Sequence, residues 1–426
     1  MRPVSLSATR VGVLIVSLVL LVGTASVGVA DDWKGATETR DGIDYVMNPS
    51  EGMTGPVTIT PQELWRIGGD SESDEEFFGV INQMATDPDG NVYLLDRQLS
   101  EVKVFSPAGE YLRTIGREGE GPGEFRQALD MFFLPDGNLG VLQLAPGRIV
   151  MLTPDGEPVG DHPLPENEDG ATSTLVSGSC LGENILLVVS ENAPQDGKVD
   201  ITRALIMVDS EGNEIKRLLS SVRELEFVNF TFTETVWRTF DNRWRVGPAD
   251  NLYAAEEYLD YAISVWDSEG NKKRVITREY EHWNRTDAQK EEMHDLFDAL
   301  LQNQLPQYKI EISPHDPDIT SIYPREDGTM WVLSSHGTRN LSEGTMGTFD
   351  VFDSEGRFIR QVTLMGEGEP IKDSYFFLGD RLFVVTDALE ANIASRGGRR
   401  GAEADEVEPE PIAIICYKLD ALKAGM

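Results

Sequence analysis

The sequence is poor in cysteine, histidine and basic residues. Its 426 residues include 2 Cys and 5 His, and 37 Lys and Arg face 73 Asp and Glu, so the formal net charge is −36. Cys180 and Cys416 lie in apolar, strand-like contexts (SGSCLG, IAIICYKL), so we expect two buried thiols and no cysteine metal site. The negative charge argues against nucleic acid and anionic membranes as partners. It favours solubility in an outer compartment, and an attraction for divalent cations or basic ligands is the alternative, which charge count alone does not separate.

Familiar catalytic motifs are also missing. The chain has no nucleophile elbow, HExxH, Walker loop or EF-hand loop. Residues 116–125 (GREGEGPGEF) carry four glycines and could suggest a phosphate cradle. A phosphate cradle leads into the N-terminus of a helix, whereas this stretch lies between two strand-like phrases, YLRTIG and ALDMFFLPDG. We therefore predict a connection between strands.

Long apolar runs are absent except near the N-terminus. Arg2 and Arg10 flank the start of the run Val11–Gly23, and Gly28–Ala30 places small residues where a signal peptidase reads them. This predicts a signal peptide over residues 1–30, cleaved near Ala30, and export to the periplasm or the medium. No Cys at the cleavage site means that it is not a lipoprotein signal. Retention as an anchor stays open, although the run is short for a span. Loss of two Arg would change the charge from −36 to −38.

What is present is a repeat. An apolar strand, a Ser/Asp-x-x-Gly turn and a second strand recur five times, for example as VKVFSPAGEYLRTIG and AISVWDSEGNKKRVI. A second strand–turn–strand phrase, for example ATDPDGNVYLLD, precedes each copy, and a sixth (FFLGDRLFVVTD) precedes the last strand. Glycine at the turn supplies the positive φ of a hairpin. The turn glycines are Gly109, Gly156, Gly212, Gly270 and Gly356.

Two hairpins per unit and six units predict an all-β fold, a six-bladed β-propeller of four-stranded blades. The first two units are 47 residues apart. The sixth unit lacks its fourth strand, while residues 63–69 (ELWRIGG) resemble the fourth-strand phrase YLRTIG. We therefore predict that N- and C-terminal strands close one blade, which removes the open edges of a solenoid or a string of sandwiches.

The repeat unit resembles NHL-type repeats, with G-x-G-x-G-P-G-x-F before the inner strand and D-G-x-h-Y-h-h-D after it. The chain is similar to exported bacterial six-bladed propellers of largely uncharacterised role. The similarity is sharp over residues 77–160, weaker over 161–260 and partial to residue 419. It implies the fold and little about activity, because propellers host both binding and catalysis.

Three segments depart from the repeat within a propeller domain expected over residues 58–420. Residues 31–57 form an N-terminal extension with a predicted hairpin that turns at Asp41-Gly42. Residues 281–306 predict a helix with a capping box at Thr286 and Gln289, which either packs against the propeller or forms a lid. Residues 389–411 lack apolar periodicity and predict a flexible loop.

Ligand sites in propellers gather on the face that carries the blade-to-blade loops and the loops between the second and third strands. The densest cluster of Trp and Arg is WRTFDNRWR (237–245), which suits stacking on a sugar ring or gripping a carboxylate. The alternative is that its tryptophans wedge between blades, as is common in propellers. The candidate ligand-binding residues are Arg97, Arg117, Arg126, Trp237, Arg238, Arg243, Trp244, Tyr258, His336 and Arg339.

A metal site is the alternative. The five histidines, His162, His282, His294, His315 and His336, share no repeat position, so a zinc site has no support from spacing. A single Ca²⁺ in the channel is conceivable, although acidic residues are frequent enough to give such a set by chance. The candidate ligands are Asp130, Asp241, Asn242 and Asp373.

These observations favour an exported, non-catalytic module that binds a small organic or carbohydrate ligand, or a partner protein, over one face. We expect no cofactor, with Ca²⁺ as the exception. The alternative is a metal-dependent lyase or lactonase with Ca²⁺ or Zn²⁺ at the central channel. Three or more His, Asp, Asn or Glu side chains at the channel mouth within reach of one ion would favour that alternative.

Overall fold

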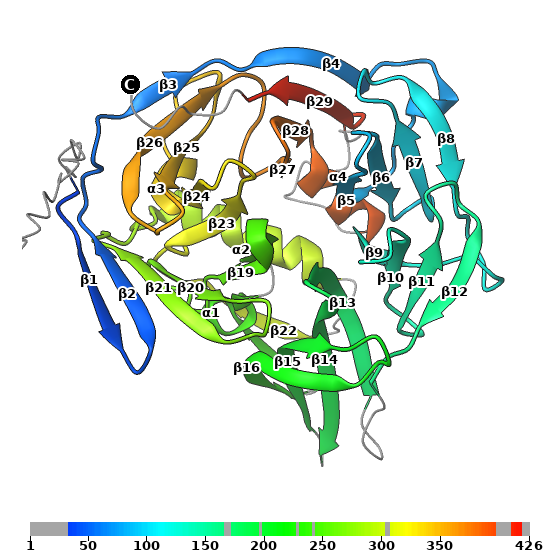
Figure 1. The fold of residues 1–426 in the computed structure, drawn as a ribbon, viewed down its shortest axis with the longest axis horizontal. Coiled ribbons are helices and arrows are strands. Elements are labelled where there is room, and N and C mark those ends of the chain that lie inside the picture. The colour runs from blue at the N-terminus through cyan, green and yellow to red at the C-terminus, as the bar shows by residue number, and fades with distance from the viewer. Residues whose placement is uncertain are drawn as a thin grey trace, which may run out of the picture. The chain divides into compact units, whose positions relative to one another are not determined.

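The strands form six main sheets that follow one another around a ring (Figure 1). This computed structural model describes residues 33–165, 172–195, 198–226, 230–240, 243–302, 307–397 and 410–419, so the predicted signal peptide lies outside the described residues. Within each sheet the four repeat strands pair antiparallel with their neighbours. The fold is therefore the predicted six-bladed β-propeller.

The first three blades follow the chain order of the repeats. Their strands are β5 (Ile81–Thr86), β6 (Val92–Asp96), β7 (Glu101–Phe105) and β8 (Tyr111–Ile115) in blade 1, β9 (Ala128–Phe133), β10 (Leu139–Gln143), β11 (Arg148–Leu152) and β12 (Pro158–His162) in blade 2, and β13 (Thr172–Leu181), β14 (Asn184–Gln195), β15 (Lys198–Val208) and β16 (Glu214–Glu226) in blade 3.

The last three blades also recruit strands from the N-terminal segment. Their strands are β18 (Trp244–Gly247), β19 (Asn251–Ala254), β20 (Ala262–Trp266) and β21 (Lys272–Arg278) in blade 4, β23 (Ile319–Pro324), β24 (Met330–Ser334), β25 (Thr345–Phe352) and β26 (Phe358–Met365) in blade 5, and β27 (Ser374–Leu378), β28 (Arg381–Val385), β29 (Ala413–Lys418) and β4 (Gln62–Gly68) in blade 6.

Blade 6 closes the ring as the sequence predicts. Strand β4 pairs antiparallel with β29, so that Ile67 lies opposite Ile414 and Trp65 opposite Cys416. The Trp65 indole also donates a hydrogen bond of 3.0 Å to the Pro107 carbonyl of blade 1. Strands from the N- and C-terminal parts of the chain thus complete one sheet, in which β29 is paired on both sides.

The N-terminal segment runs along the outside of the ring before it reaches β4. Strands β1 (Ala36–Arg40) and β2 (Ile43–Asn48) form the hairpin predicted at Asp41-Gly42, and both turn residues have positive φ. The sequence could not show where this hairpin attaches. Strand β2 pairs parallel with β21, and β3 (Val57–Ile59) pairs parallel with β26, so this segment covers the outer edges of blades 4 and 5.

Six apolar clusters hold the ring together, one between each pair of neighbouring blades. Between blades 1 and 2, for example, Leu95 and Val104 pack with Met131 and Val141. All five residues of β6 are buried because both faces of its sheet are covered. Each fully buried aliphatic side chain of this kind contributes about 1.5–3 kcal/mol.

The glycine-rich segment 116–125 is the predicted connection between blades. It joins β8 to β9 and ends at Phe125, whose fully buried ring belongs to the cluster between blades 1 and 2. Gly116 and Gly123 have φ values of +74°, which other residues adopt only with strain. Strand β9, and not a helix, follows the segment, so the segment lacks the helix N-terminus that a phosphate cradle needs.

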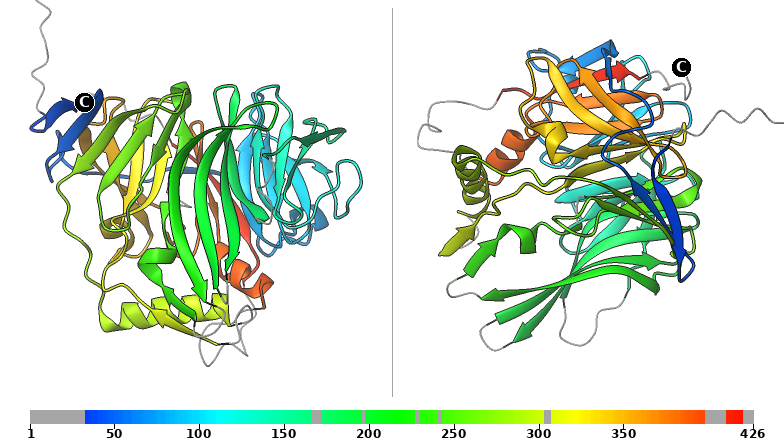
Figure 2. Two further views of the ribbon diagram at one scale, coloured as in Figure 1. Left: turned by 90° about the horizontal axis from the view of Figure 1, so that it is seen from below. Right: turned by 90° about the vertical axis from the view of Figure 1, so that its left-hand side faces the viewer.

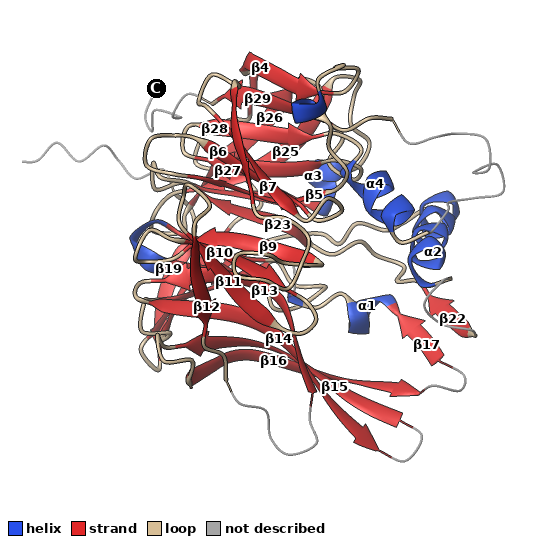
Figure 3. Cartoon of the chain, turned by 90° about the vertical axis from the view of Figure 1, so that its right-hand side faces the viewer, coloured by secondary structure: helices blue, strands red, loops and turns tan. Residues whose placement is uncertain are grey.

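One face of the ring carries most of the helical structure (Figures 2 and 3). Between blades 3 and 4 lie β17 (Phe230–Thr233) and α1 (Glu234–Trp237), and between blades 4 and 5 lie α2 (Asp287–Leu301) and β22 (Tyr308–Glu311). Helix α3 (Ser335–Thr338) lies within blade 5 and α4 (Ala388–Ser395) within blade 6. We refer to residues 230–240, 279–302, 307–318 and 388–397 as the cap.

Helix α2 begins with the predicted capping box, in which the Thr286 hydroxyl accepts from the Gln289 amide at 3.2 Å. Its apolar stripe packs on other cap segments, with Phe297 4.6 Å from Phe232 between ring centroids and Ile393 of α4 in the same cluster. Since β17 follows blade 3 and α4 belongs to blade 6, the helix joins elements from opposite sides of the ring. It both packs its stripe and covers part of the face.

The flexible loop predicted over residues 389–411 is wrong in its first part. Residues 388–395 form α4, because Leu389 and Ile393 join the cap cluster while Ala388 and Ala391 pack on the cluster between blades 6 and 1. Its short apolar stripe needs these partners, which local periodicity does not reveal. Residues 398–409 lie outside the described residues. No helix in the described ranges is long and apolar enough to cross a membrane.

Candidate functional site

A pocket of about 100 Å³ opens where the connection between blades 3 and 4 meets the start of blade 5. Four of the ten residues predicted from sequence line it together. The full lining is Trp237, Arg238, Thr239, Arg243, Tyr258, Pro317 and Thr320.

The wall formed by α1 is rigid because its aromatic residue is anchored from behind. The Trp237 ring packs edge-on against Phe230, with centroids 5.3 Å apart, and is stacked with Phe232 at 6.1 Å. The Arg223 guanidinium lies 5.2 Å from the Trp237 ring centroid. Trp237 therefore remains half-buried and fixed while it lines the pocket.

The opposite wall is held by hydrogen bonds. Arg243 is buried and donates to the Glu257 carbonyl at 2.8 Å and to the Thr239 carbonyl at 3.0 Å. The Tyr258 hydroxyl donates to Glu234 at 2.8 Å, and burial together with this neighbouring carboxylate raises the pKa of Tyr258 well above its ordinary value. Tyr258 is therefore a neutral donor that ties the blade 4 loop to α1.

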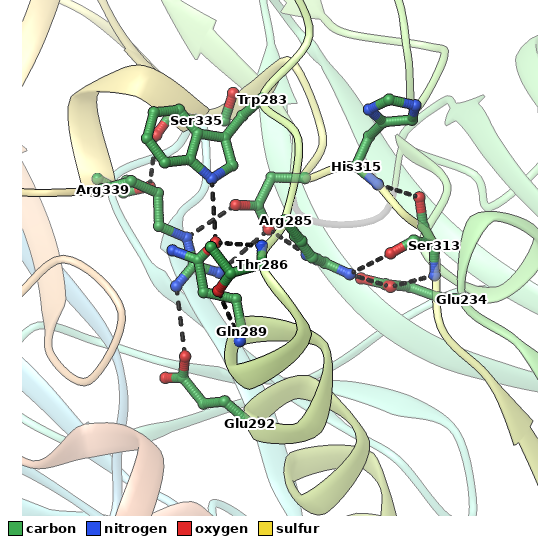
Figure 4. Close-up of polar contacts among 12 residues, drawn as sticks. Glu234, Trp283, Arg285, Thr286, Gln289, Glu292, Ser313, His315, Ser335 and Arg339 are labelled. Carbon is green, nitrogen blue, oxygen red and sulfur yellow. Dashed lines mark hydrogen bonds and ion pairs between the residues drawn. The ribbon is translucent and has the colours of Figure 1, made fainter.

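A buried chain of ion pairs joins the two walls (Figure 4). Arg285 is fully buried and binds both oxygens of Glu234, at 2.6 and 2.9 Å, and Asp316 at 2.7 Å. Asp316 also accepts from Arg339 at 2.7 and 3.1 Å. Glu234 belongs to α1, and Asp316 directly precedes Pro317, which lines the pocket with Thr320 at the start of blade 5. The Arg285 guanidinium therefore fixes α1 relative to this third part of the lining.

Glu234 and Asp316, the two carboxyls of this series of buried ion pairs, are both ionised at neutral pH. Burial alone would raise the pKa of Glu234, but the hydrogen bonds and charge of Arg285 outweigh it and lower that pKa. In the same way the pKa of Asp316 is lowered, because Arg339 and Arg285 outweigh burial. Both carboxyls are therefore ionised and paired, as buried charges must be.

Histidine and aspartate also meet beside the pocket. The His282 Nδ1 atom lies 2.8 Å from Asp318 Oδ1, and the His282 and His315 rings are 5.6 Å apart between centroids. Burial is the main cause that raises the pKa of Asp318. Within the described ranges, however, no three His, Cys, Asp or Glu side chains form a group that could hold a metal ion.

Six predicted ligand-binding residues lie outside the pocket lining. Arg97 bonds to Ser395 of α4 at 2.7 Å. Arg117 pairs with Glu124 and Arg126 with Glu120, all on the connection between blades 1 and 2. Trp244 is buried in the cluster between blades 3 and 4. His336 is exposed and lies edge-on to the rings of Trp283 and Tyr280, and Arg339 forms an ion pair with Asp316.

The predicted metal ligands are engaged in other contacts or lie outside the described residues. Asp130 accepts three hydrogen bonds, from Gln83 at 2.7 Å, Met131 N at 2.8 Å and Gly178 N at 2.9 Å. Asp373 accepts from the amides of Glu369 and Asp387, at 2.7 and 2.9 Å. Asp241 and Asn242 lie outside the described residues.

The residues that sequence reasoning missed are those that organise the pocket. Glu234 comes from the connection between blades 3 and 4, and Arg285 and Asp316 come from the two ends of the connection between blades 4 and 5, so no repeat position or spacing relates them. Thr239, Pro317 and Thr320 carry no chemical signature of their own. Only the isolated Arg285 beside a capping box could have drawn attention to the first turn of the insertion.

A larger hollow, of about 390 Å³, lies at the outer rim. It is lined mainly by the connecting segment 50–56, together with Phe358 and Gln361. None of the predicted ligand-binding residues lines it. The small pocket on the cap face is therefore the stronger candidate.

Comparison with known proteins defines the class of fold. A family described as 6-bladed beta-propeller matches residues 73–156. The chain is similar to a member of the DUF4221 family from Bacteroides vulgatus, at 11% identity and a TM-score of 0.50, with 84% of this chain and 97% of that chain covered. At that identity the similarity shows the fold alone, which is that of a six-bladed propeller.

Two further solved structures are similar to this chain at lower scores. A Bacteroides fragilis protein described as exported covers 85% of this chain and 99% of its own, at 14% identity and a TM-score of 0.48. Virginiamycin B lyase from Staphylococcus aureus covers 84% and 99%, at 10% identity and a TM-score of 0.38. These scores carry no functional argument. No curated protein sequence matches the chain.

Proposed function

We propose that this chain is an exported, non-catalytic propeller that binds a small organic or carbohydrate ligand in the pocket on its cap face. The observation that carries this proposal is the convergence of Trp237, Arg238, Arg243 and Tyr258 on one pocket. The walls of that pocket are fixed relative to each other by buried ion pairs, and a fixed site loses less entropy when a ligand binds.

The chemistry of the lining suggests the kind of ligand. An aromatic ring offers a stacking surface, and a half-buried guanidinium donates to carboxylate or hydroxyl oxygens. Arg238 keeps 39% of its side chain exposed and shares Glu234 at 3.2 Å, so it can turn part of its donor fork to a ligand. Val236 and Leu259, which adjoin Trp237 and Tyr258 in sequence, are exposed apolar residues.

The metal-dependent lyase or lactonase remains the weaker candidate. Such an enzyme needs several side-chain oxygens or nitrogens that face one ion. The carboxylate oxygens of Asp130 and Asp373 accept hydrogen bonds from backbone amides. Within the described ranges, no three His, Cys, Asp or Glu side chains form a group that could hold a metal ion. Elemental analysis of the purified protein is the check, because stoichiometric Zn²⁺ or tightly retained Ca²⁺ would favour the enzyme.

The proposal of export rests on the sequence features of residues 1–30. The strongly negative net charge argues against nucleic acid as a partner. Intact-mass analysis of the secreted protein should find a chain that starts after Ala30. A mass that includes residues 1–30 would show an uncleaved anchor.

The binding proposal is tested by a thermal-shift screen with neutral monosaccharides and small carboxylates, followed by calorimetric titration of the best compound. Arg238→Gln should weaken binding of that compound about tenfold or more, as expected for a lost charged hydrogen bond. Arg126→Gln removes the same charge from the blade 1–2 connection and should leave affinity unchanged. Equal affinities in the two variants would refute the pocket as the binding site.

A further inference from the structure

The cap-face pocket differs in charge from the chain as a whole. The chain carries 73 Asp and Glu against 37 Lys and Arg, yet the described residues that line the pocket include two arginines and no carboxylate. Glu234 is the carboxylate that bonds to this lining, through Arg238 and Tyr258, and it is fully buried. The described lining is therefore positive, although the chain is strongly negative.

Glu234 holds Arg238 less tightly than it holds its other partners. Its Oε1 atom accepts from Tyr258 at 2.8 Å, from Arg285 at 2.9 Å and from Arg238 at 3.2 Å. Its Oε2 atom accepts from Arg285 at 2.6 Å and from the Ser313 amide at 3.1 Å. A carboxylate offers about four lone-pair sites, so five donors share them, and the bond from Arg238 is the longest of the five.

Arg238 is also the positive end of the buried ion pairs. The charged groups alternate in the order Arg238, Glu234, Arg285, Asp316, Arg339 and Glu292, and the part from Glu234 to Glu292 can be followed in Figure 4. Arg285 and Arg339 each contact two carboxylates, whereas Arg238 contacts one within the described residues. A carboxylate bound in the pocket would give Arg238 the second partner that the other two arginines have.

The pocket also offers unused hydrogen-bond donors. Within the described residues, only Nη1 of the Arg238 side chain forms a hydrogen bond, so Nε and Nη2 are available. These two atoms form one edge of the guanidinium and can bind both oxygens of a carboxylate while Nη1 stays on Glu234. The neighbouring Thr239 hydroxyl accepts from Arg223 at 2.8 Å, which leaves its proton for an acceptor in the pocket.

The rest of the lining is suited to carbon. Trp237, Tyr258 and Pro317 contribute rings to the pocket, and Trp237 is fixed by its packing on Phe230 and Phe232. The volume of about 100 Å³ is small beside the roughly 300–1,000 Å³ of sites that enclose drug-sized ligands. The pocket therefore suits an end group, with the remainder of the ligand outside it.

We propose that the cap-face pocket recognises the carboxylate of a ring-bearing organic acid, whose sugar or apolar ring lies against Trp237. Arg238 binds the carboxylate through Nε and Nη2, and the Thr239 hydroxyl donates to it. A phosphate dianion fits less well, because Glu234 lies 3.2 Å from Arg238 and repels a second negative charge. The proposal rests on the proposed function, since it names the ligand class of the same pocket.

The test is calorimetric titration of the whole protein at low ionic strength with two matched pairs, glucuronate with glucose and benzoate with benzyl alcohol. Each acid should bind about tenfold or more tightly than its neutral partner, as expected for a hydrogen bond to a charged group. The pair with the tighter acid identifies the ring as sugar or apolar. Tighter binding of inorganic phosphate than of either acid would overturn the proposal.

Arg238→Gln should lower the affinity for each acid to that of its neutral partner and change the neutral affinity less. This loss of preference is not the result of general unfolding, which would abolish both. Arg238→Lys keeps the charge without the fork and should retain part of the preference. Arg126→Gln is the matched control, because Arg126 is also partly exposed and pairs with Glu120 at 3.1 Å, and it should keep the full preference.

The outcomes separate this proposal from the proposed function. If acid and neutral partner bind the wild type equally and Arg238→Gln weakens both, the pocket binds ligands but does not select carboxylates. If Arg238→Gln keeps the preference for the acids, the carboxylate is bound elsewhere and this proposal is wrong. If none of the probes binds the wild type, both proposals are contradicted.

Discussion

The blades and the cap are built on different principles. Blades 1 to 5 are each built on four consecutive strands that pair with near neighbours in sequence, and blade 6 is completed by β4 from the N-terminal segment. Six apolar clusters join the blades around the ring. The cap consists of segments from three connections, held by one apolar cluster and a buried chain of ion pairs. Repeated local pairing makes the frame, and contacts between distant segments make the candidate site.

The sharpest way to break this comparison is to open the ring. A chain that starts at Gly69 lacks β4 and leaves β29 without its partner and Ile414 without Ile67. We expect no stable monomer from this chain, because the exposed edge of β29 invites aggregation. Circular dichroism melting and size-exclusion chromatography measure the effect.

A chain that starts at Pro56 is the control for that truncation. It loses only β1 and β2, which cover the outer edge of blade 4. It should still fold and melt cooperatively at a lower temperature. Equal behaviour of the two truncations would contradict the role of β4 in closure.

The second largest effect should fall on the cap alone. Arg285→Met leaves Glu234 and Asp316 buried without their shared counter-charge, which costs about 3–5 kcal/mol. Chymotrypsin should then cut within 279–318 well before the blades unfold, as followed by mass spectrometry and circular dichroism. Lys290→Gln, which breaks an exposed pair with Asp287 on the same insertion, should change stability by less than about 1 kcal/mol.

Acid should loosen the cap before the blades. The pKa values of Glu234 and Asp316 are lowered from 4.5 and 3.8, so their stabilising effect is complete above those values and is lost as pH falls toward the lowered ones. Proteolysis of the cap should therefore accelerate below about pH 4.5. A cap as resistant at pH 3 as at pH 7 would show that these pairs do not hold it.

For Asp373 we expect the opposite pH dependence, a free energy of unfolding that falls as pH rises. Burial is the main cause that raises its pKa from 3.8 to about 6, so the folded state binds its proton more tightly and loses stability as pH rises from about 4 to 6. Asp373→Asn should remove this decline from the free energy of unfolding measured against pH. An unchanged profile in the variant would mean that Asp373 titrates normally.

The smallest effects concern the turns of the repeat. Gly137 has a φ of +85° and open space around it, so Gly137→Ala should cost only the backbone strain, about 1 kcal/mol. Gly109 has a φ of +81°, and a Cβ there would lie 2.8 Å from the Trp65 ring, so Gly109→Ala should cost more. Denaturant unfolding of both variants compares them directly.

The difference between locally paired blades and a cap of distant segments also explains how much of the structure the sequence could predict. Turn glycines and alternating apolar residues are local signals, so the six blades, the closure by residues 63–69, the Asp41-Gly42 hairpin and the Thr286 capping box were all predictable. Helix α4 was missed, because its short stripe is stabilised by distant partners in the cap cluster and in the blade 6–1 cluster.

For the candidate site, residue type was a partial guide. Trp237, Arg238, Arg243 and Tyr258 could be selected because aromatic and guanidinium groups are dense in that stretch. Their partners could not, since the pairing of Glu234 with Arg285 spans 51 positions and arises only when two connections meet on the cap face. Trp244 illustrates the ambiguity, because the same composition places it between blades.

The most direct test of the central claim is a crystal structure of the protein with the best compound from the thermal-shift screen. The account predicts density for that compound in the cap-face pocket, in contact with the Arg238 guanidinium and the Trp237 ring. Density for the compound elsewhere, for instance on the Arg117 and Arg126 connection, with the pocket empty, would contradict it.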